Sequence, residues 1–117
     1  MSGSGRCSPE ATTLAQRKRN EATRRTLAAD AAVRALRDYA RGHGGRYVVF
    51  GSYVTGAMRY DSDLDVLVDF PVELTPQAWR FAEDVCAGTA VPLDIHDART
   101  ATPAFCERVM SRGLLLP

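Results

Sequence analysis

The chain has 117 residues, of which 45% are hydrophobic and 25% are charged, and its formal net charge is +1. This length suits one compact domain and is too short for a catalytic domain together with a full substrate-binding domain. The nearly balanced charge does not indicate a nucleic acid or a membrane surface as partner.

The cysteines and the hydropathy pattern argue against two further classes of protein. Cys7, Cys86 and Cys106 are odd in number and far apart, which disfavours a disulfide framework and favours a reducing environment. No stretch approaches the roughly 18 apolar residues of a membrane helix, and the first residues lack the apolar segment of a signal peptide. We therefore expect a cytoplasmic protein that makes no membrane contact.

The beginning of the chain predicts a disordered segment followed by a helix. Residues 1–8 are rich in glycine and serine and are expected to be disordered. Ser8 is a suitable helix N-cap, and Pro9 suits the first helical position. We expect a single domain over residues 9–117.

The helical pattern runs to about Arg41 and has two unlike halves. The second half carries an apolar stripe that includes Leu27 and Leu36. The stretch 16–25 is basic and polar nearly all round. Such a stretch is more often a solvated helix face than a nucleic-acid contact, so nucleic-acid binding is not expected.

Strands and helices alternate in the rest of the chain. Short apolar runs predict strands at 47–50, 64–70 and 90–95, and helical patterns predict helices at 53–59, 76–87 and 101–112. The order indicates an α/β (α+β) fold, with a small mixed sheet of three or more strands covered by about four helices.

Two carboxylates stand at the mouth of the second predicted strand. Asp63 and Asp65 are two residues apart, and because side chains alternate along a strand, both point to one face of the sheet. Two like charges this close repel each other unless a cation lies between them. Carboxylate oxygens suit Mg²⁺, which often bridges to substrate phosphates. The pair therefore indicates a metal-assisted phosphoryl-transfer site.

Two other features join this pair. Gly51 and Ser52 follow the first strand directly, where a missing Cβ lets backbone N–H groups approach a phosphate. Asp94 is a lone carboxylate in an apolar strand and is costly to bury without a partner. If its strand neighbours the second, Asp94 becomes a third metal ligand and the base for an acceptor hydroxyl.

The pattern of Gly51-Ser52, ten residues, and Asp63-x-Asp65 resembles the signature of the DNA polymerase β nucleotidyltransferase superfamily. With the context GSYVTG and SDLDVLV, and with Asp94 in a later strand, it is similar to the minimal nucleotidyltransferase (MNT) branch, over residues 46–97. The resemblance implies transfer of a nucleoside monophosphate from ATP or another NTP to an acceptor hydroxyl.

The resemblance also implies roles for individual residues. Gly51 and Ser52 would hold the β- and γ-phosphates, and Asp63, Asp65 and Asp94 would hold Mg²⁺, with two ions expected. Many members carry an arginine just before the glycine that corresponds to Gly56, where this chain has Thr55. Arg59 is the candidate replacement for that phosphate contact.

The partner and the acceptor follow only from the resemblance. MNT proteins often pair with a HEPN-domain protein, and some are antitoxins that AMPylate that toxin, so a HEPN-type partner is expected and a homo-oligomer stays open. Two alternatives remain. In the first alternative, the chain is the catalytic subunit of a small-molecule nucleotidyltransferase of the aminoglycoside type. In the second, it is a non-catalytic antitoxin that acts by occlusion.

Other interpretations of the acidic stretch are weaker. A solvated acidic turn does not account for the spacing from Gly51, and no Gly-Lys-Ser/Thr of a P-loop follows that glycine. An EF-hand fails because Val66 and Val72 stand where glycine and glutamate are needed. For Asp69 we expect a structural role, and His96 is a candidate for lining the site.

Overall fold

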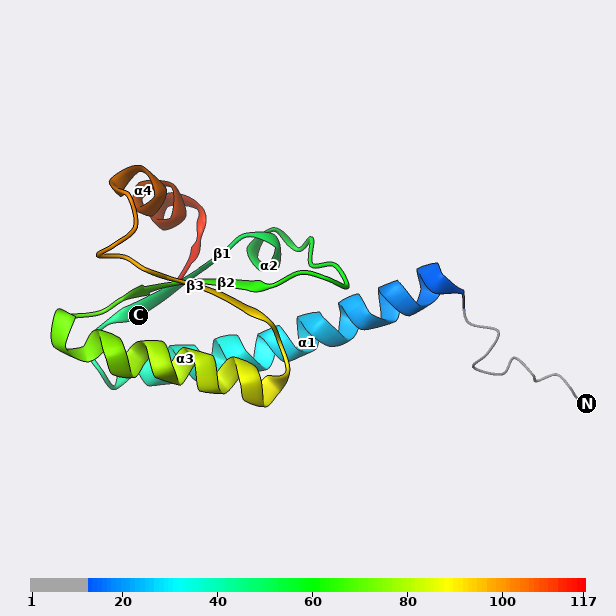
Figure 1. The fold of residues 1–117 in the computed structure, drawn as a ribbon, viewed down its shortest axis with the longest axis horizontal. Helices are drawn as coiled ribbons and strands as arrows, with labels where there is room; N and C mark the ends of the chain where they lie inside the picture. Colours follow the sequence, from blue (N-terminus) through cyan, green and yellow to red (C-terminus); the bar gives the residue numbers. More distant parts are fainter. Residues whose placement is uncertain (1–12) are drawn as a thin grey trace, which may run out of the picture.

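The computed structural model describes residues 13–117. Predictions for residues 1–8, and the helix start at Ser8, lie outside the described residues, and the single-domain organisation over 9–117 stays a prediction. The described part forms a four-stranded mixed sheet with helices on both faces (Figure 1). This confirms the expected α+β class with three or more strands and about four helices.

The first described helix is long and extends well past the sheet. Helix α1 spans Leu14–Arg41, and the hydroxyl of Thr13 accepts a hydrogen bond from the backbone N–H of Gln16 at 3.1 Å. The backbone of Thr13 is extended, so α1 begins at Leu14. The prediction that Leu27 belongs to the apolar stripe is wrong, because this residue is 63% exposed. The buried stripe is Ala29, Ala32, Val33, Leu36 and Ala40.

The strands occupy the order β3-β2-β1-β4. Strand β1 (Arg46–Phe50) pairs antiparallel with β2 (Leu64–Asp69) and with β4 (Leu114–Leu116), whereas β2 pairs parallel with β3 (Leu93–Asp97). The third strand begins three residues later than predicted, because Ala90 takes a left-handed conformation that ends the preceding helix. Strand β4 was not predicted.

The remaining helices are α2 (Ser52–Thr55), α3 (Thr75–Thr89) and α4 (Pro103–Arg112), with a 3₁₀ turn, η3, at Val72–Leu74. Helix α2 is one turn, shorter than predicted, because Gly56 caps it in the left-handed conformation with φ +74°. An added Cβ at this glycine would meet nothing within 4 Å, so close packing against the sheet does not require glycine there. Thr75 is the first residue of α3 and not its cap.

The two faces of the sheet are covered differently. Helices α1 and α3 lie side by side on one face and enclose the main core, which includes Tyr47, Val49 and Val66. Helix α4 covers part of the other face through Val109, which packs with Val48 and Leu67 (Figure 1). Within residues 13–117, no helix is both long and apolar enough to cross a membrane. The thin cover on the α4 face leaves polar side chains of β2 and β3 accessible.

Candidate active site

The acidic side chains of β2 and β3 meet on the α4 face of the sheet. In the parallel pair, Asp65 lies directly opposite Asp94, and Leu67 lies opposite His96. Asp65 and Leu67 share a face because they are two residues apart, and Leu67 packs in the α4-side core. Asp63 immediately precedes the strand and points to this same side by alternation. The structure thus brings together the three carboxylates that the sequence singled out.

The pKa of Asp65 reflects how close the three carboxylates lie to one another. Partial burial, the charge and hydrogen bonding of Asp94, and the charge of Asp63 together raise the pKa of Asp65 from 3.8 to about 6. His96 acts in the opposite direction. Asp63 and Asp94 are exposed, and the side chain of Asp94 is 53% accessible. The cluster is therefore a concentrated negative charge open to solvent, which a cation would relieve.

Gly51 makes the closest approach to this cluster. Its backbone has φ +79° and ψ −148°, a conformation that L-residues rarely adopt. A Cβ added there would collide with the Asp65 carboxylate and lie 3.1 Å from its Cγ. Gly51 is the N-cap of α2, and no side chain caps this helix by a hydrogen bond. Ser52 is the first residue of the helix and is half-buried next to Gly51.

His96 lies beside Asp94. Its Nε2 is 3.3 Å from Oδ1 of Asp94, and its ring packs against Phe50 and Phe105, with centroid distances of 5.9 Å and 5.1 Å. The sequence named His96 as the histidine that would line the site, and the geometry agrees. The two aromatic rings hold the imidazole, and the imidazole in turn orients the Asp94 carboxylate.

Asp69 lies on the same face of β2 but is engaged elsewhere. Its Oδ2 accepts a hydrogen bond from Nε of Arg46 at 2.7 Å. The expected structural role of Asp69 therefore agrees with its ion pair.

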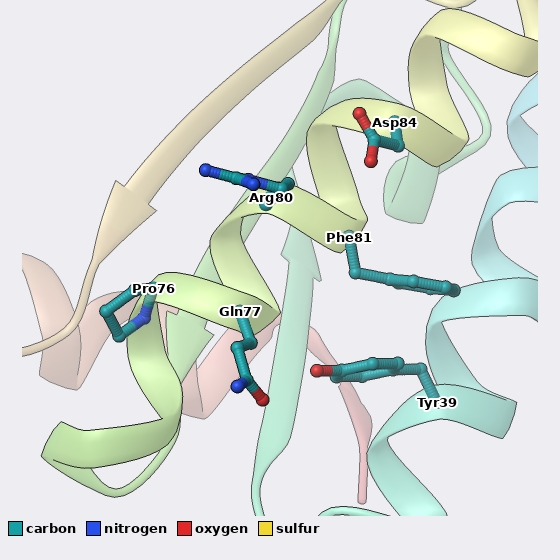
Figure 2. Close-up of a pocket in the computed structure, with 6 residues that line it drawn as sticks. All are labelled: Tyr39, Pro76, Gln77, Arg80, Phe81 and Asp84. Carbon is teal, nitrogen blue, oxygen red and sulfur yellow. The ribbon is translucent and has the colours of Figure 1, made fainter.

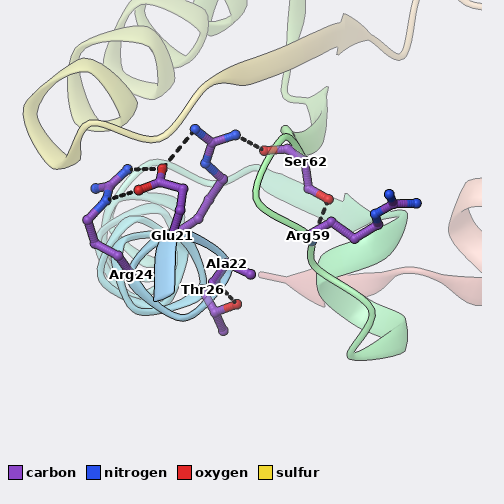
Figure 3. A network of polar contacts seen from close by, with 7 residues as sticks. Glu21, Ala22, Arg24, Thr26, Arg59 and Ser62 are labelled. Carbon is purple, nitrogen blue, oxygen red and sulfur yellow. Dashed lines mark hydrogen bonds and ion pairs between the residues drawn. The ribbon is translucent and has the colours of Figure 1, made fainter. Parts of the chain in front are cut away.

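The loop that leads into Asp63 is attached to α1 by Arg25, which belongs to the basic stretch 16–25. Figure 3 shows its partners Glu21 and Ser62. Arg25 donates from one guanidinium nitrogen to the carbonyl of Ser62 at 3.1 Å and from another to Glu21 at 3.1 Å. Glu21 also pairs with the more exposed Arg24 at 2.6 Å. Arg25 therefore fixes the position of the loop, and part of the basic stretch 16–25 is structural.

Arg59 lies in the same loop, away from the glycine turn. Its backbone N–H donates to Oγ of Ser62 at 2.8 Å (Figure 3). Its exposed side chain lines a groove with Lys18 and Tyr60. The groove that contains Gly51 has other lining residues. A phosphate contact by Arg59 stays a prediction, and the structure does not bring this residue together with Gly51.

The groove over Gly51 has a volume of about 280 Å³ and runs between the glycine turn and α4. Phe50, Gly51 and Thr55 line one side, and Arg108 and Arg112 of α4 line the other. The sequence analysis missed both arginines, because nothing in the local sequence of a helix indicates which strand end it faces. A second groove of about 410 Å³, lined by Tyr39, Gln77 and Phe81 among others, lies on the opposite side of the sheet (Figure 2).

The carboxylates of the site suit a metal ion whose other ligands are water molecules and substrate phosphates. Within residues 13–117, no three His, Cys, Asp or Glu side chains could hold an ion by themselves. Mg²⁺ is usually held by one or two carboxylates, several waters and substrate phosphates, not by an all-protein cage. The facing oxygens of Asp65 and Asp94, with Asp63 nearby, fit this mode of binding.

Comparison with known proteins identifies the family of this chain. The protein adenylyltransferase MntA of Shewanella oneidensis is 30% identical over 66 residues, which are 56% of this chain and 48% of that protein. The match thus spans about half the length of the relative. A crystal structure of a toxin–antitoxin with AMP-PNP is 28% identical, with a TM-score of 0.48, over 62% of this chain and 59% of the other. The nucleotidyltransferase domain family matches residues 30–113, and the chain therefore belongs to this family, the fold and enzyme class expected from its sequence.

Proposed function

We propose that the protein transfers a nucleoside monophosphate from ATP or another NTP to a hydroxyl group of a partner protein, in a Mg²⁺-dependent reaction. The observation that carries this proposal is the register of the parallel strands, which sets Asp65 opposite Asp94 beside the glycine turn. Two facing carboxylates with Asp63 nearby, next to a glycine whose backbone no side chain covers, suit triphosphate chemistry.

Each residue has a role in the proposed reaction. Asp63, Asp65 and Asp94 would hold Mg²⁺, which when bound neutralises charge on the triphosphate. Gly51 and Ser52 position the β- and γ-phosphates, because no side chain at residue 51 separates the backbone from the ligand. The acceptor hydroxyl attacks the α-phosphorus, the bond to the bridging oxygen breaks, and pyrophosphate leaves.

Asp94 is suited to receive the proton of the attacking hydroxyl. The Asp94 side chain is 53% exposed, more than the His96 side chain at 36%, and the imidazole holds the carboxylate through its Nε2. General-base transfer requires the acceptor group within hydrogen-bond reach, and an exposed carboxylate leaves room for a macromolecular acceptor.

The choice of a protein acceptor rests on sequence similarity. MntA, the relative from Shewanella oneidensis, is described as a protein adenylyltransferase, and the matched stretch is about half of its length. Together with the resemblance to the MNT branch, this supports an antitoxin that AMPylates a HEPN-type toxin in the cytoplasm. The accessible carboxylates support an acceptor that approaches from outside the domain.

The test uses the purified protein, labelled ATP, Mg²⁺ and the product of the neighbouring gene. We expect label on that protein with wild type, and at least about a hundredfold less with Asp65→Asn or with EDTA. Asp69→Asn is the matched control, since Asp69 lies on the same face of the same strand but pairs with Arg46. Equal labelling by wild type and Asp65→Asn would refute the proposed reaction.

A non-catalytic antitoxin is the second candidate. It is favoured by Thr55, which stands where many members carry an arginine. If the protein acts by occlusion, Asp63→Ala/Asp65→Ala neutralises the toxin as well as wild type does. If it acts by transfer, the double variant still binds the toxin but no longer neutralises it.

A further inference from the structure

We propose that Arg108 and Arg112 of α4 bind the β- and γ-phosphates of the nucleotide from the side opposite the glycine turn. This inference rests on the proposed function and adds two phosphate-binding residues to it. The observation behind it is the groove in which these arginines face Gly51.

Gly51 connects this groove to the carboxylates. It lines the groove, and it also lies so close to Asp65 that an added Cβ would collide with the carboxylate. A phosphate chain lying along the glycine turn therefore has the acidic cluster at one end and α4 at its flank. Phe50 and Phe105, whose ring centroids are 5.6 Å apart, line this groove with the arginines, and both rings also contact His96.

Among the described residues, 13–117, the two guanidinium groups have no anionic partner. Arg108 and Arg112 are four residues apart on α4, so their side chains project from the same face of the helix. Within residues 13–117, neither guanidinium forms an ion pair or a hydrogen bond, and Arg108 only lies over the ring of Phe105, 5.7 Å from its centroid. Like charges at this spacing destabilise a helix, and an anion between them removes the repulsion.

Other cations of the described residues are engaged or lie elsewhere. Arg46 and Arg99 pair with Asp69 and Asp97, and Arg59 lines a different groove. Thr55 lines the groove over Gly51 but offers only a hydroxyl, which donates to the carbonyl of Ser52. A triphosphate beside three carboxylates needs positive charge besides the metal, and Arg108 and Arg112 are placed to supply it.

The experiment measures dissociation constants for ATP and for AMP by calorimetry in the presence of Mg²⁺. Arg108→Ala and Arg112→Ala are each expected to weaken ATP binding about tenfold, because a charge-assisted hydrogen bond to phosphate is lost. AMP, which lacks the β- and γ-phosphates, should bind all variants as it binds wild type. Lysine at either position should restore part of the ATP affinity.

Arg80→Ala is the matched control. Arg80 is an exposed arginine of α3 in the groove beside Tyr39 and Phe81, on the far side of the sheet (Figure 2). Its replacement should leave both dissociation constants unchanged. Thermal unfolding of every variant verifies that a loss of affinity does not come from unfolding.

The outcomes separate this inference from the proposed function. A double Arg108→Ala/Arg112→Ala variant that binds ATP as wild type does overturns the inference alone, and so does an equal loss of ATP and AMP affinity. Unchanged ATP affinity with loss of toxin binding also overturns it and assigns the arginines to the partner interface. Wild type that binds no ATP overturns both proposals.

Discussion

Gly51→Ala is the substitution that tests the site geometry most directly. The backbone of Gly51, at φ +79° and ψ −148°, lies in a region that is almost restricted to glycine, so alanine costs on the order of 1–3 kcal/mol of folding free energy. The new Cβ also collides with the Asp65 carboxylate. Asp65 can relieve the collision only by turning away, which separates it from Asp94. We therefore expect ATP binding to fall at least about tenfold, beyond the loss of stability.

Gly56→Ala separates the two effects. Gly56 also has a positive φ, +74°, but an added Cβ there meets nothing within 4 Å. This variant should lose about 1–2 kcal/mol of unfolding free energy from backbone strain alone and keep its affinity for ATP. Urea denaturation measures the stability of both variants, and calorimetry measures their ATP binding.

An Asp65→Ala background gives a further check, because the colliding carboxylate is then absent. In that background, Gly51→Ala should cost only the backbone strain, on the order of 1–3 kcal/mol. If Gly51→Ala in the wild-type background keeps full ATP affinity, the close approach of the glycine turn to Asp65 is not what shapes the site.

Three further predictions concern single groups. The pKa of Asp65 is raised to about 6, so in metal-free buffer the folded protein binds this proton more tightly than the unfolded chain does. The contribution of Asp65 to the free energy of unfolding therefore falls as the pH rises from about 4 to 6. Urea denaturation should therefore find Asp65→Asn about 1 kcal/mol more stable than wild type at pH 7.5, after allowance for solvent screening, and equal near pH 4; equality at both would contradict the shift. Arg25→Ala should lower the unfolding free energy by about 1–3 kcal/mol and reduce nucleotide transfer, because the loop before the carboxylates loses its attachment to α1. Replacing the more exposed Arg24 by alanine should cost less than about 0.5 kcal/mol. Equal losses in the two variants would refute the attachment. Tyr53→Phe should cost about 1–3 kcal/mol in thermal unfolding, because the hydroxyl donates to the Asp30 carboxylate at 2.6 Å; an unchanged midpoint would show that this bond does not hold α2 to α1.

The elements that follow from local sequence signals were predicted with small errors. Strand β2 and helices α3 and α4 lie close to their predicted ranges, because apolar periodicity and proline positions act within a few residues. The errors lie where a neighbour decides the outcome. Strand β4 has only three residues and exists because Leu114–Leu116 pair with β1, which no local pattern indicates.

The candidate site divides in the same way. The sequence determined that Asp63 and Asp65 share a face and that Gly51 begins a turn, since side-chain alternation and the conformational freedom of glycine are local properties. Only the tertiary structure decided that Asp94 stands opposite Asp65 and that α4 turns two arginines toward the glycine. Both depend on strand register and helix packing between segments far apart in the chain, and these are set by the core as a whole and not by neighbouring residues.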